Sequence, residues 1–340
     1  MPAKVASMPC EPSRMGSTSA GTCGEGCHSN IINPVGFAFE AFDPVGRHRT
    51  EENGAPVEGD LANLKHFYDR GIRYITLTHG RDNQLSDSSY DTTRTWQGLS
   101  PFGLEVVDAM NRLGMIVDIS HLSDSAATQV LRRSRAPVFA SHSSARHFTP
   151  GWERNMSDEM IVRLAENGGL IMINFGSAFI SEESWRYGEA FGEAYDAWLE
   201  ETGTERSDEA RRRFNEQYSA EYGSYPFSTL DQVLDHFDHV IELTGVDYVG
   251  IGSDYDGVGD TLPIGLKDVS DYPNLINGLL DRGYSVDEFA VDLWRYFSSG
   301  TGGTSDGLLL QLRPGRNRSL WLLDSDGERR QITGISFQQP

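Results

Sequence analysis

The sequence contains little cysteine and no long apolar run. Its 340 residues include three cysteines, Cys10, Cys23 and Cys27, which all lie near the N-terminus. An odd and clustered count provides no disulfide framework, so we expect a reducing compartment, by default the cytoplasm. The most apolar stretch, residues 168–180, is too short and too interrupted to span a bilayer, and residues 1–21 lack the apolar run of a signal peptide. We therefore expect no membrane partner for this chain.

Positive charge is also scarce. Lysine and arginine number 29 against 50 aspartates and glutamates, which gives a net charge of −21. Such a surface excludes a broad affinity for nucleic-acid phosphates, so no nucleic-acid partner is expected. Apolar residues make up 38% and aromatic residues 10% of the chain, which is too much for a disordered acidic tail. The length suffices for one large domain or two ordinary ones.

Short apolar segments alternate with helical patterns from residue 61 onward. The predicted strands are residues 74–79, 115–121, 136–142, 170–174 and 248–254. Helices are predicted between them; one at 102–113 ends at Gly114, and one from about 230 begins with a capping box from Ser228 and Asp231. This alternation predicts the α/β class, with a parallel sheet covered by helices.

A polar side chain stands at the carboxyl end of each predicted strand. These residues are His79, His121, His142, Asn174 and Asp254. In parallel α/β folds, and especially in the eight-stranded barrel, catalytic groups come from the carboxyl ends of the strands. Imidazoles and carboxylates that converge in one crevice form the ligand set of zinc or a similar divalent metal. The pattern therefore indicates a metal-dependent hydrolase.

The sequence lacks the motifs of two other kinds of site, the dinucleotide-binding loop and the nucleophile elbow of serine hydrolases. Residues 250–255 lack the third glycine of a dinucleotide loop, and Asp254 would repel a pyrophosphate there. The chain has no Gly-x-Ser-x-Gly elbow, so serine hydrolysis has no candidate nucleophile.

His236 and His239, beside Asp235 and Asp238, resemble a helical metal pair, but the helical pattern places them on a polar face, so we expect a solvated surface.

Longer motifs make the assignment more specific. They are Glu52–Gly54, Arg73–His79, Gly98–Gly103, Asn111–His121, Ala136–Ala145, Arg154–Asn155, Gly250–Gly257 and Gly265–Ser270. With these motifs, residues 52–288 resemble the membrane dipeptidase (renal dipeptidase) family of metallopeptidases. The resemblance implies a (β/α)8 TIM barrel of the metal-dependent hydrolase type. It also implies two zinc ions per chain and the hydrolysis of dipeptides.

The resemblance also implies roles for the metal ligands. Glu52 is similar to the carboxylate that bridges both metals, and His121 and His142 are similar to ligands of the second zinc. Asp254 matches the residue beside the first zinc, which handles the proton in catalysis. Two cations that share a hydroxide make it nucleophilic at neutral pH, in agreement with these roles.

Substrate contacts are implied in the same way. His79 corresponds to a histidine that touches the substrate in catalysis, and Arg154 to the arginine that receives the dipeptide carboxylate. Arg146 is a nearby competitor for the second role. Asn174, at the neighbouring strand end, is a further expected substrate contact. A guanidinium offers a carboxylate two parallel hydrogen bonds, which favours dipeptides over longer chains.

The chain departs from the family pattern before Glu52. The family's first zinc depends on a His-x-Asp pair at the end of its first strand, and residues 1–50 contain none: Ser29-Asn30 follow His28, and Arg49-Thr50 follow His48. We therefore expect the first one or two barrel strands to be missing or degenerate. Either the N-terminal coding region, with any export signal, was lost or frame-shifted, or the chain is a diverged relative that binds one zinc or none.

These observations predict three segments. Residues 1–50 form an atypical, poorly ordered N-terminal segment, residues 51–297 the metallodipeptidase-like barrel, and residues 298–340 an atypical extension. Within the barrel, residues 181–226 form an aromatic-rich helical insertion, which is either a lid or a homodimer surface. The function expected is a zinc dipeptidase that is impaired by the absent metal pair. The alternatives are a related amidase or β-lactamase, and an inactive relative that acts in binding or assembly.

Overall fold

The computed structural model describes residues 57, 59–70 and 72–284 in full, and the backbone of residues 307–309, 320–323 and 329–332. Glu52 and the predicted segment 1–50 lie outside the described residues. The domain boundaries proposed from the sequence therefore stay predictions.

Five short parallel strands form the centre of the fold. They are β1 (Tyr74–Thr76), β2 (Ile116–Asp118), β3 (Phe139–Ser143), β4 (Leu170–Ile173) and β5 (Val249–Ile251). Each strand pairs with the next one in the chain, so the sheet order is β1-β2-β3-β4-β5. This is the sequential order of a (β/α)8 barrel, and the predicted α/β class with a parallel sheet is confirmed.

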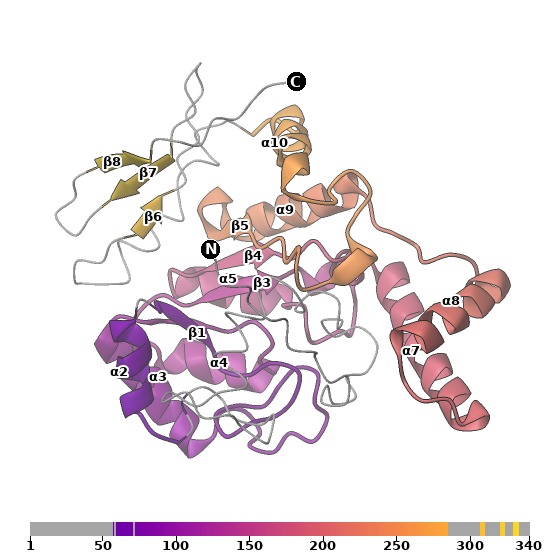
Figure 1. Cartoon of the computed structure of the whole chain (residues 1–340). Helices are drawn as coiled ribbons and strands as arrows, with labels where there is room; N and C mark the ends of the chain where they lie inside the picture. The colour runs from indigo at the N-terminus through magenta and orange to yellow at the C-terminus, as the bar shows by residue number, and fades with distance from the viewer. Residues whose placement is uncertain are drawn as a thin grey trace, which may run out of the picture.

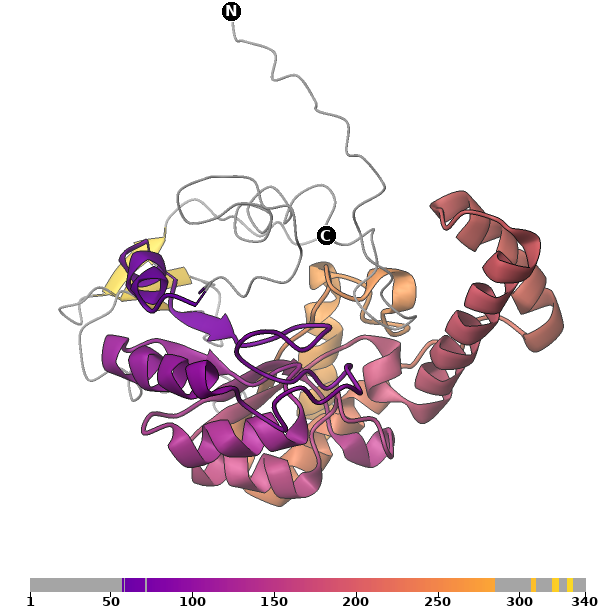
Figure 2. The same ribbon diagram turned by 90° about the horizontal axis from the view of Figure 1, so that it is seen from below.

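Helices lie before, between and after these strands, and those between the strands cover one face of the sheet (Figures 1 and 2). They are α2 (Ala62–Asp69), α3 (Pro101–Leu113), α4 (Asp124–Arg133), α5 (Asp158–Glu166), α9 (Leu230–Thr244) and α10 (Tyr272–Asp281). Alternation along each strand divides the apolar side chains between two clusters. Val117 and Ile171 join the large core under the helices, whereas Ile116, Leu170 and Met172 form a small cluster on the opposite face.

Local capping explains where the helices begin and end. The Ser100 side chain accepts a hydrogen bond from the Gly103 amide at the start of α3, and Gly114 ends this helix with φ 75°. The capping box of α9 consists of Thr229 and Gln232. The prediction of Ser228 and Asp231 was wrong by one residue, because the Ser228 hydroxyl bonds to the Ser177 carbonyl instead.

Between β4 and α9 the chain forms α6 (Ser177–Ile180), α7 (Glu182–Thr202) and α8 (Asp208–Tyr222). Figure 1 shows that α7 and α8 project away from the sheet. They share an aromatic cluster of their own, which contains Phe191, Tyr195, Phe214 and Tyr218. The role of this hairpin as a lid or a dimer surface stays a prediction.

Shorter elements complete the description. One-turn 3-10 helices are η2 (Arg146–Phe148), η3 (Val246–Tyr248), η4 (Gly259–Thr261) and η5 (Val269–Asp271). A small antiparallel sheet contains β6 (Gly307–Leu309), β7 (Leu320–Leu323) and β8 (Arg329–Ile332). In the part of the chain that the structure describes, none of the helices has both the length and the apolar character needed to cross a membrane.

Candidate functional site

Three histidines meet at the carboxyl edge of the sheet, and we call them the histidine cluster: His79, His121 and His142. The ring centroids of His79 and His121 lie 4.3 Å apart, and those of His121 and His142 lie 4.8 Å apart. The Nε2 atoms of His121 and His142 are separated by 2.8 Å. His79 and His121 follow β1 and β2, and His142 lies within β3, so the parallel strands bring the three side chains together.

The two inner imidazoles are held in the neutral form. Burial lowers the pKa of His121 well below its usual value, and the Arg154 guanidinium lowers it further. The same two causes, in the same order, lower the pKa of the partly buried His142, against a weaker opposing effect of Asp118. A neutral imidazole has a free nitrogen lone pair, which is the form that binds a metal ion.

A buried hydrogen-bond chain orients His142. The Ser141 hydroxyl donates to Oδ2 of Asp118 over 2.6 Å and lies 2.6 Å from Nδ1 of His142. Because the hydroxyl proton goes to Asp118, the Ser141 oxygen accepts from Nδ1–H of His142. This assigns the proton to Nδ1 and directs the Nε2 lone pair of His142 at Nε2 of His121, 2.8 Å away.

Asp118 anchors this chain across three strands. It is fully buried, and its carboxylate also accepts hydrogen bonds from the Thr76 hydroxyl and from the Ser120 and Ser141 amides. Sequence reasoning missed Asp118 and Ser141. The available signal was the acidic residue inside an otherwise apolar strand, because a buried carboxylate requires partners.

The histidine cluster fits a divalent metal of the zinc type. Nδ1 of His121 is buried and has no hydrogen-bond partner in the structure. His121 also has a positive φ of 67°, as does Asp254 with 55°. Such backbone conformations are uncommon for residues other than glycine; Arg94 and Gln97, outside the cluster, share them. Two neutral imidazoles that face each other are suitable donors for zinc. Glu52, the predicted bridging ligand, lies outside the described residues.

Asn174 and Asp254 form a polar pair further along the same edge. Nδ2 of Asn174 donates to Oδ2 of Asp254 over 2.8 Å. Asn174 follows β4, and Asp254 lies after β5. The backbone amide of Asn174 donates to the carbonyl of Ser143, the residue after His142, so the pair lies beside the end of β3. Gly257 makes room for the carboxylate, because a Cβ at this position would lie 1.9 Å from Oδ1 of Asp254.

Arg154 is buried beside the histidine cluster. It is 2% exposed, and its Nη1 and Nη2 atoms donate to the Ser143 hydroxyl and the His142 carbonyl, each over 2.7 Å. Among the described residues it makes no ion pair with a carboxylate, and its Nε atom is buried without a partner. Arg146, the competitor, forms a two-fold ion pair with Asp124. Of the two arginines, Arg154 is thus the one without a carboxylate partner among the described residues.

The structure corrects the expectation for the histidines of α9. His236 is fully buried rather than solvated, with Nδ1 accepting from the Ala145 amide and Nε2 donating to the Ile180 carbonyl. The helical pattern could not show that Phe148, from the loop after β3, covers this side of the helix at a ring distance of 4.3 Å. Asp235 and Asp238 bind Arg282.

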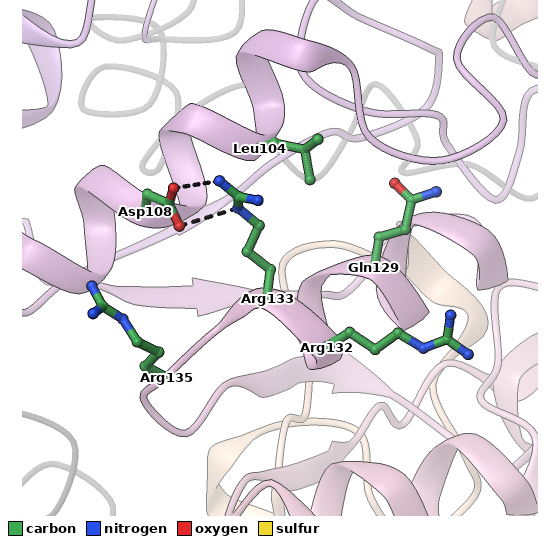
Figure 3. A pocket seen from close by; sticks show the side chains of 6 residues that line it. All are labelled: Leu104, Asp108, Gln129, Arg132, Arg133 and Arg135. Atoms are coloured by element: carbon green, nitrogen blue, oxygen red, sulfur yellow. Dashed lines mark hydrogen bonds and ion pairs between the residues drawn. The ribbon is translucent and has the colours of Figure 1, made fainter.

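An open hollow of about 760 Å³ lies between α3 and α4 (Figure 3), and its lining contains no residue of the histidine cluster. Its lining contains Leu104, Asp108, Gln129, Arg132, Arg133 and Arg135. The single carboxylate, Asp108, is bound by Arg133, and the lining includes no histidine. This hollow therefore offers no free general base or metal ligand set, and the strand edge is the stronger candidate for an active site.

Comparison with family models gives a match over most of the chain. Residues 45–296 match the model described as membrane dipeptidase (peptidase family M19). Residues 9–52 match a second model, which is described as a protein of unknown function. The first match includes every residue of the histidine cluster, together with Asn174 and Asp254.

Curated relatives agree with this match. An uncharacterized dipeptidase of Schizosaccharomyces pombe is 37% identical over 235 residues, which cover 69% of this chain and 47% of the relative. Dipeptidase 3 of Mus musculus is 34% identical over 241 residues, or 70% of this chain and 40% of the relative. The chain thus spans about half the length of the curated relatives it matches.

Solved structures are similar in fold. The probable dipeptidase PvdM from Pseudomonas aeruginosa matches with a TM-score of 0.59 and 27% identity, over 73% of this chain and 67% of that chain. A metallo peptidase from Rhodobacter sphaeroides, liganded with a phosphinate mimic of the dipeptide L-Ala-D-Ala, matches with a TM-score of 0.56 and 26% identity. That match covers 73% of this chain and 62% of the other.

Proposed function

The chain belongs to the membrane dipeptidase family of metallopeptidases, and from this premise we propose that it hydrolyses the peptide bond of dipeptides with a zinc-activated water. The observation that carries the proposal is the 2.8 Å approach of Nε2 of His121 to Nε2 of His142. Both imidazoles are held neutral, and both come from the carboxyl edge of the sheet, where barrel enzymes place their catalytic groups.

We assign His121, His142 and Glu52 as the ligands of one zinc ion. When bound, zinc supplies a nucleophilic water at neutral pH and polarises the scissile carbonyl. The Asp118–Ser141 chain keeps the proton of His142 on Nδ1, so that Nε2 serves as the ligand atom. Because residues 1–50 contain no His-x-Asp pair, a second zinc has fewer ligands, and we expect lower activity than a complete two-metal site would give.

The remaining predicted residues are assigned to substrate and proton. Asp254 accepts a proton at its carboxylate and returns it to the leaving amine, while the Asn174 amide fixes the position of Oδ2. Arg154 uses its remaining N–H groups to bind the free carboxylate of the dipeptide. His79, the exposed member of the histidine cluster, is assigned as a further contact to the substrate. The phosphinate dipeptide mimic bound to the R. sphaeroides relative supports a dipeptide as substrate.

The test combines metal content with activity in the full chain. We expect the purified protein to contain zinc and to cleave L-Ala-D-Ala or L-Ala-L-Ala faster than the tripeptide L-Ala-L-Ala-L-Ala. His142→Ala should lower both the zinc content and the hydrolysis rate, the latter by at least about 100-fold, because it removes a ligand. His66→Ala, on α2, is the matched control and should leave both unchanged. An unchanged zinc content in His142→Ala would refute the proposal that His142 is a zinc ligand.

A second variant tests substrate recognition. Arg154→Lys keeps the positive charge but loses the planar fork, so KM for dipeptides should rise at least about tenfold. Circular dichroism and the zinc content report whether the variant is folded. A zinc-loaded, folded wild-type chain that cleaves a cyclic amide but no dipeptide would favour the amidase alternative. Absence of turnover on both substrates would favour the inactive relative.

A further inference from the structure

A second group of metal-ligating side chains lies outside the histidine cluster, and we call it the peripheral triad: His147, Asp158 and His239. One ligand atom from each residue lies within 4.8 Å of the other two. Nε2 of His239 is 2.9 Å from Oδ1 of Asp158, and the rings of His147 and His239 stack with their centroids 4.3 Å apart. The three residues come from η2, the first turn of α5 and the C-terminal half of α9.

The donor types and their spacing suit a zinc-like cation. A tetrahedral zinc site has bonds of about 2.0–2.1 Å, so its ligand atoms lie roughly 3.3 Å apart. Nε2 of His239 and Oδ1 of Asp158 lie 2.9 Å apart, somewhat closer than this spacing, so these two atoms need to separate only slightly to hold an ion between them. His147 is exposed on a single helical turn, so a side-chain rotation brings its nitrogen closer. Two imidazoles and one carboxylate favour zinc over calcium or magnesium, which prefer oxygen ligands only.

The surroundings of the peripheral triad leave room for a positive ion. His147 is exposed, and Asp158 and His239 are partly buried, so a water molecule can occupy the fourth position. The adjacent Arg146 is engaged: its guanidinium bonds to both carboxylate oxygens of Asp124, which balances its charge. His236 lies one turn before His239, but both of its ring nitrogens have protein partners, so it is not a ligand.

We propose that the peripheral triad is a separate site for a zinc-type divalent cation, which joins the loop after β3 to the helices α5 and α9. The loop already packs on α9, where the Phe148 ring lies 4.3 Å from His236 and 5.6 Å from His239. A cation bound here stabilises the folded state by mass action, because the ligands are brought together only in that state. The site supports the loop that follows His142, and it does not depend on the proposed hydrolysis.

The experiment is a titration of the metal-free full chain with zinc chloride, followed by calorimetry and by the thermal unfolding temperature. All proteins carry Cys10→Ser, Cys23→Ser and Cys27→Ser, so that free thiolates bind no zinc. The protein with the intact peripheral triad should bind one zinc ion more per chain than the His147→Ala variant. If both proteins bind the same number of zinc ions, the protein with the intact triad should bind one of them at least about tenfold more tightly. His147→Ala should also lose part of the zinc-dependent rise in unfolding temperature, and Asp158→Asn should do the same.

His147 is exposed, so its replacement leaves the fold intact, and dipeptide hydrolysis by His147→Ala should match that of the wild type where activity is found. His66→Ala is the matched control and should keep the full number of zinc equivalents. If the proposed active site binds no zinc, the wild type still binds one equivalent and His147→Ala binds none. The proposal is refuted when His147→Ala and the wild type bind the same number of zinc ions with the same affinity and the same rise in unfolding temperature.

Discussion

Acid should destabilise the fold through His236. This residue is fully buried, and burial lowers its pKa from 6.5 to about 4. The unfolded chain therefore binds a proton at a higher pH than the folded chain does. Stability contributed by the neutral imidazole is complete above pH 6.5 and is lost as the pH falls toward 4. A difference of 2.5 pKa units corresponds to about 3 kcal/mol, of which about 2 kcal/mol is lost by pH 5.

His236→Gln separates this titration from the rest of the protein. Glutamine can still donate to the Ile180 carbonyl, but the Ala145 amide loses its acceptor. A buried amide without a partner costs about 1–3 kcal/mol, so the variant should be less stable than the wild type by this amount at pH 7.5. Glutamine does not titrate, so the difference between the two proteins should shrink by about 2 kcal/mol at pH 5.

Urea unfolding of metal-free wild type and His236→Gln, at several pH values from 7.5 to 5, measures this difference. The buried imidazoles of His121 and His142 also have lowered pKa values, but they titrate in both proteins and cancel in the difference. A stability gap that stays constant over this range would show that His236 does not resist protonation in the folded state, and the reasoning would fail.

Two further predictions concern glycine and the polar pair at β4 and β5. Gly103→Ala should destabilise the fold by about 1–3 kcal/mol or more in urea unfolding, because the new Cβ would lie 2.0 Å from the Leu85 carbonyl oxygen. Gly188→Ala, with open space around it in α7, should instead stabilise the fold by about 0.5–1 kcal/mol, and equal effects of the two substitutions would contradict the packing argument. Asn174→Ala should lower kcat for dipeptides by about 10- to 100-fold with little change in KM, because Asp254 loses the amide that holds Oδ2; steady-state kinetics with an unchanged kcat would exclude this positioning role.

The sheet and the position of its histidines were predictable from the sequence because both depend on local patterns. Each strand is a short apolar segment, and each is followed by a polar residue and a helical pattern. Parallel pairing then places the carboxyl ends of neighbouring strands at one edge, whatever the details of packing. His79, His121 and His142 consequently come together in the structure, with ring distances of 4.3 and 4.8 Å.

The contacts that were missed depend on partners far away in the sequence. Asp118 receives hydrogen bonds from Thr76 and Ser141, which are 42 and 23 residues away, and these partners follow from the register of three strands. His236 is buried by Phe148 and by the carbonyl of Ile180, which lie outside its helix. A helical pattern reports only the average polarity of one face, so it cannot show which additional segment covers that face.

Arg154 takes part in both functions of the proposed site, the binding of the metal by the histidines and the binding of the substrate carboxylate. Its guanidinium is 2% exposed and is held by Ser143 and the His142 carbonyl, yet it makes no ion pair with a carboxylate among the described residues. A buried cation without a counter-ion costs several kcal/mol, and an apolar side chain of similar size would serve packing alone at lower cost. The charge lowers the pKa of His121 and His142, and in the proposed function it would also attract the carboxylate of the dipeptide. A site that needs neutral imidazoles beside a recognised carboxylate requires both effects, and a purely structural arginine requires neither.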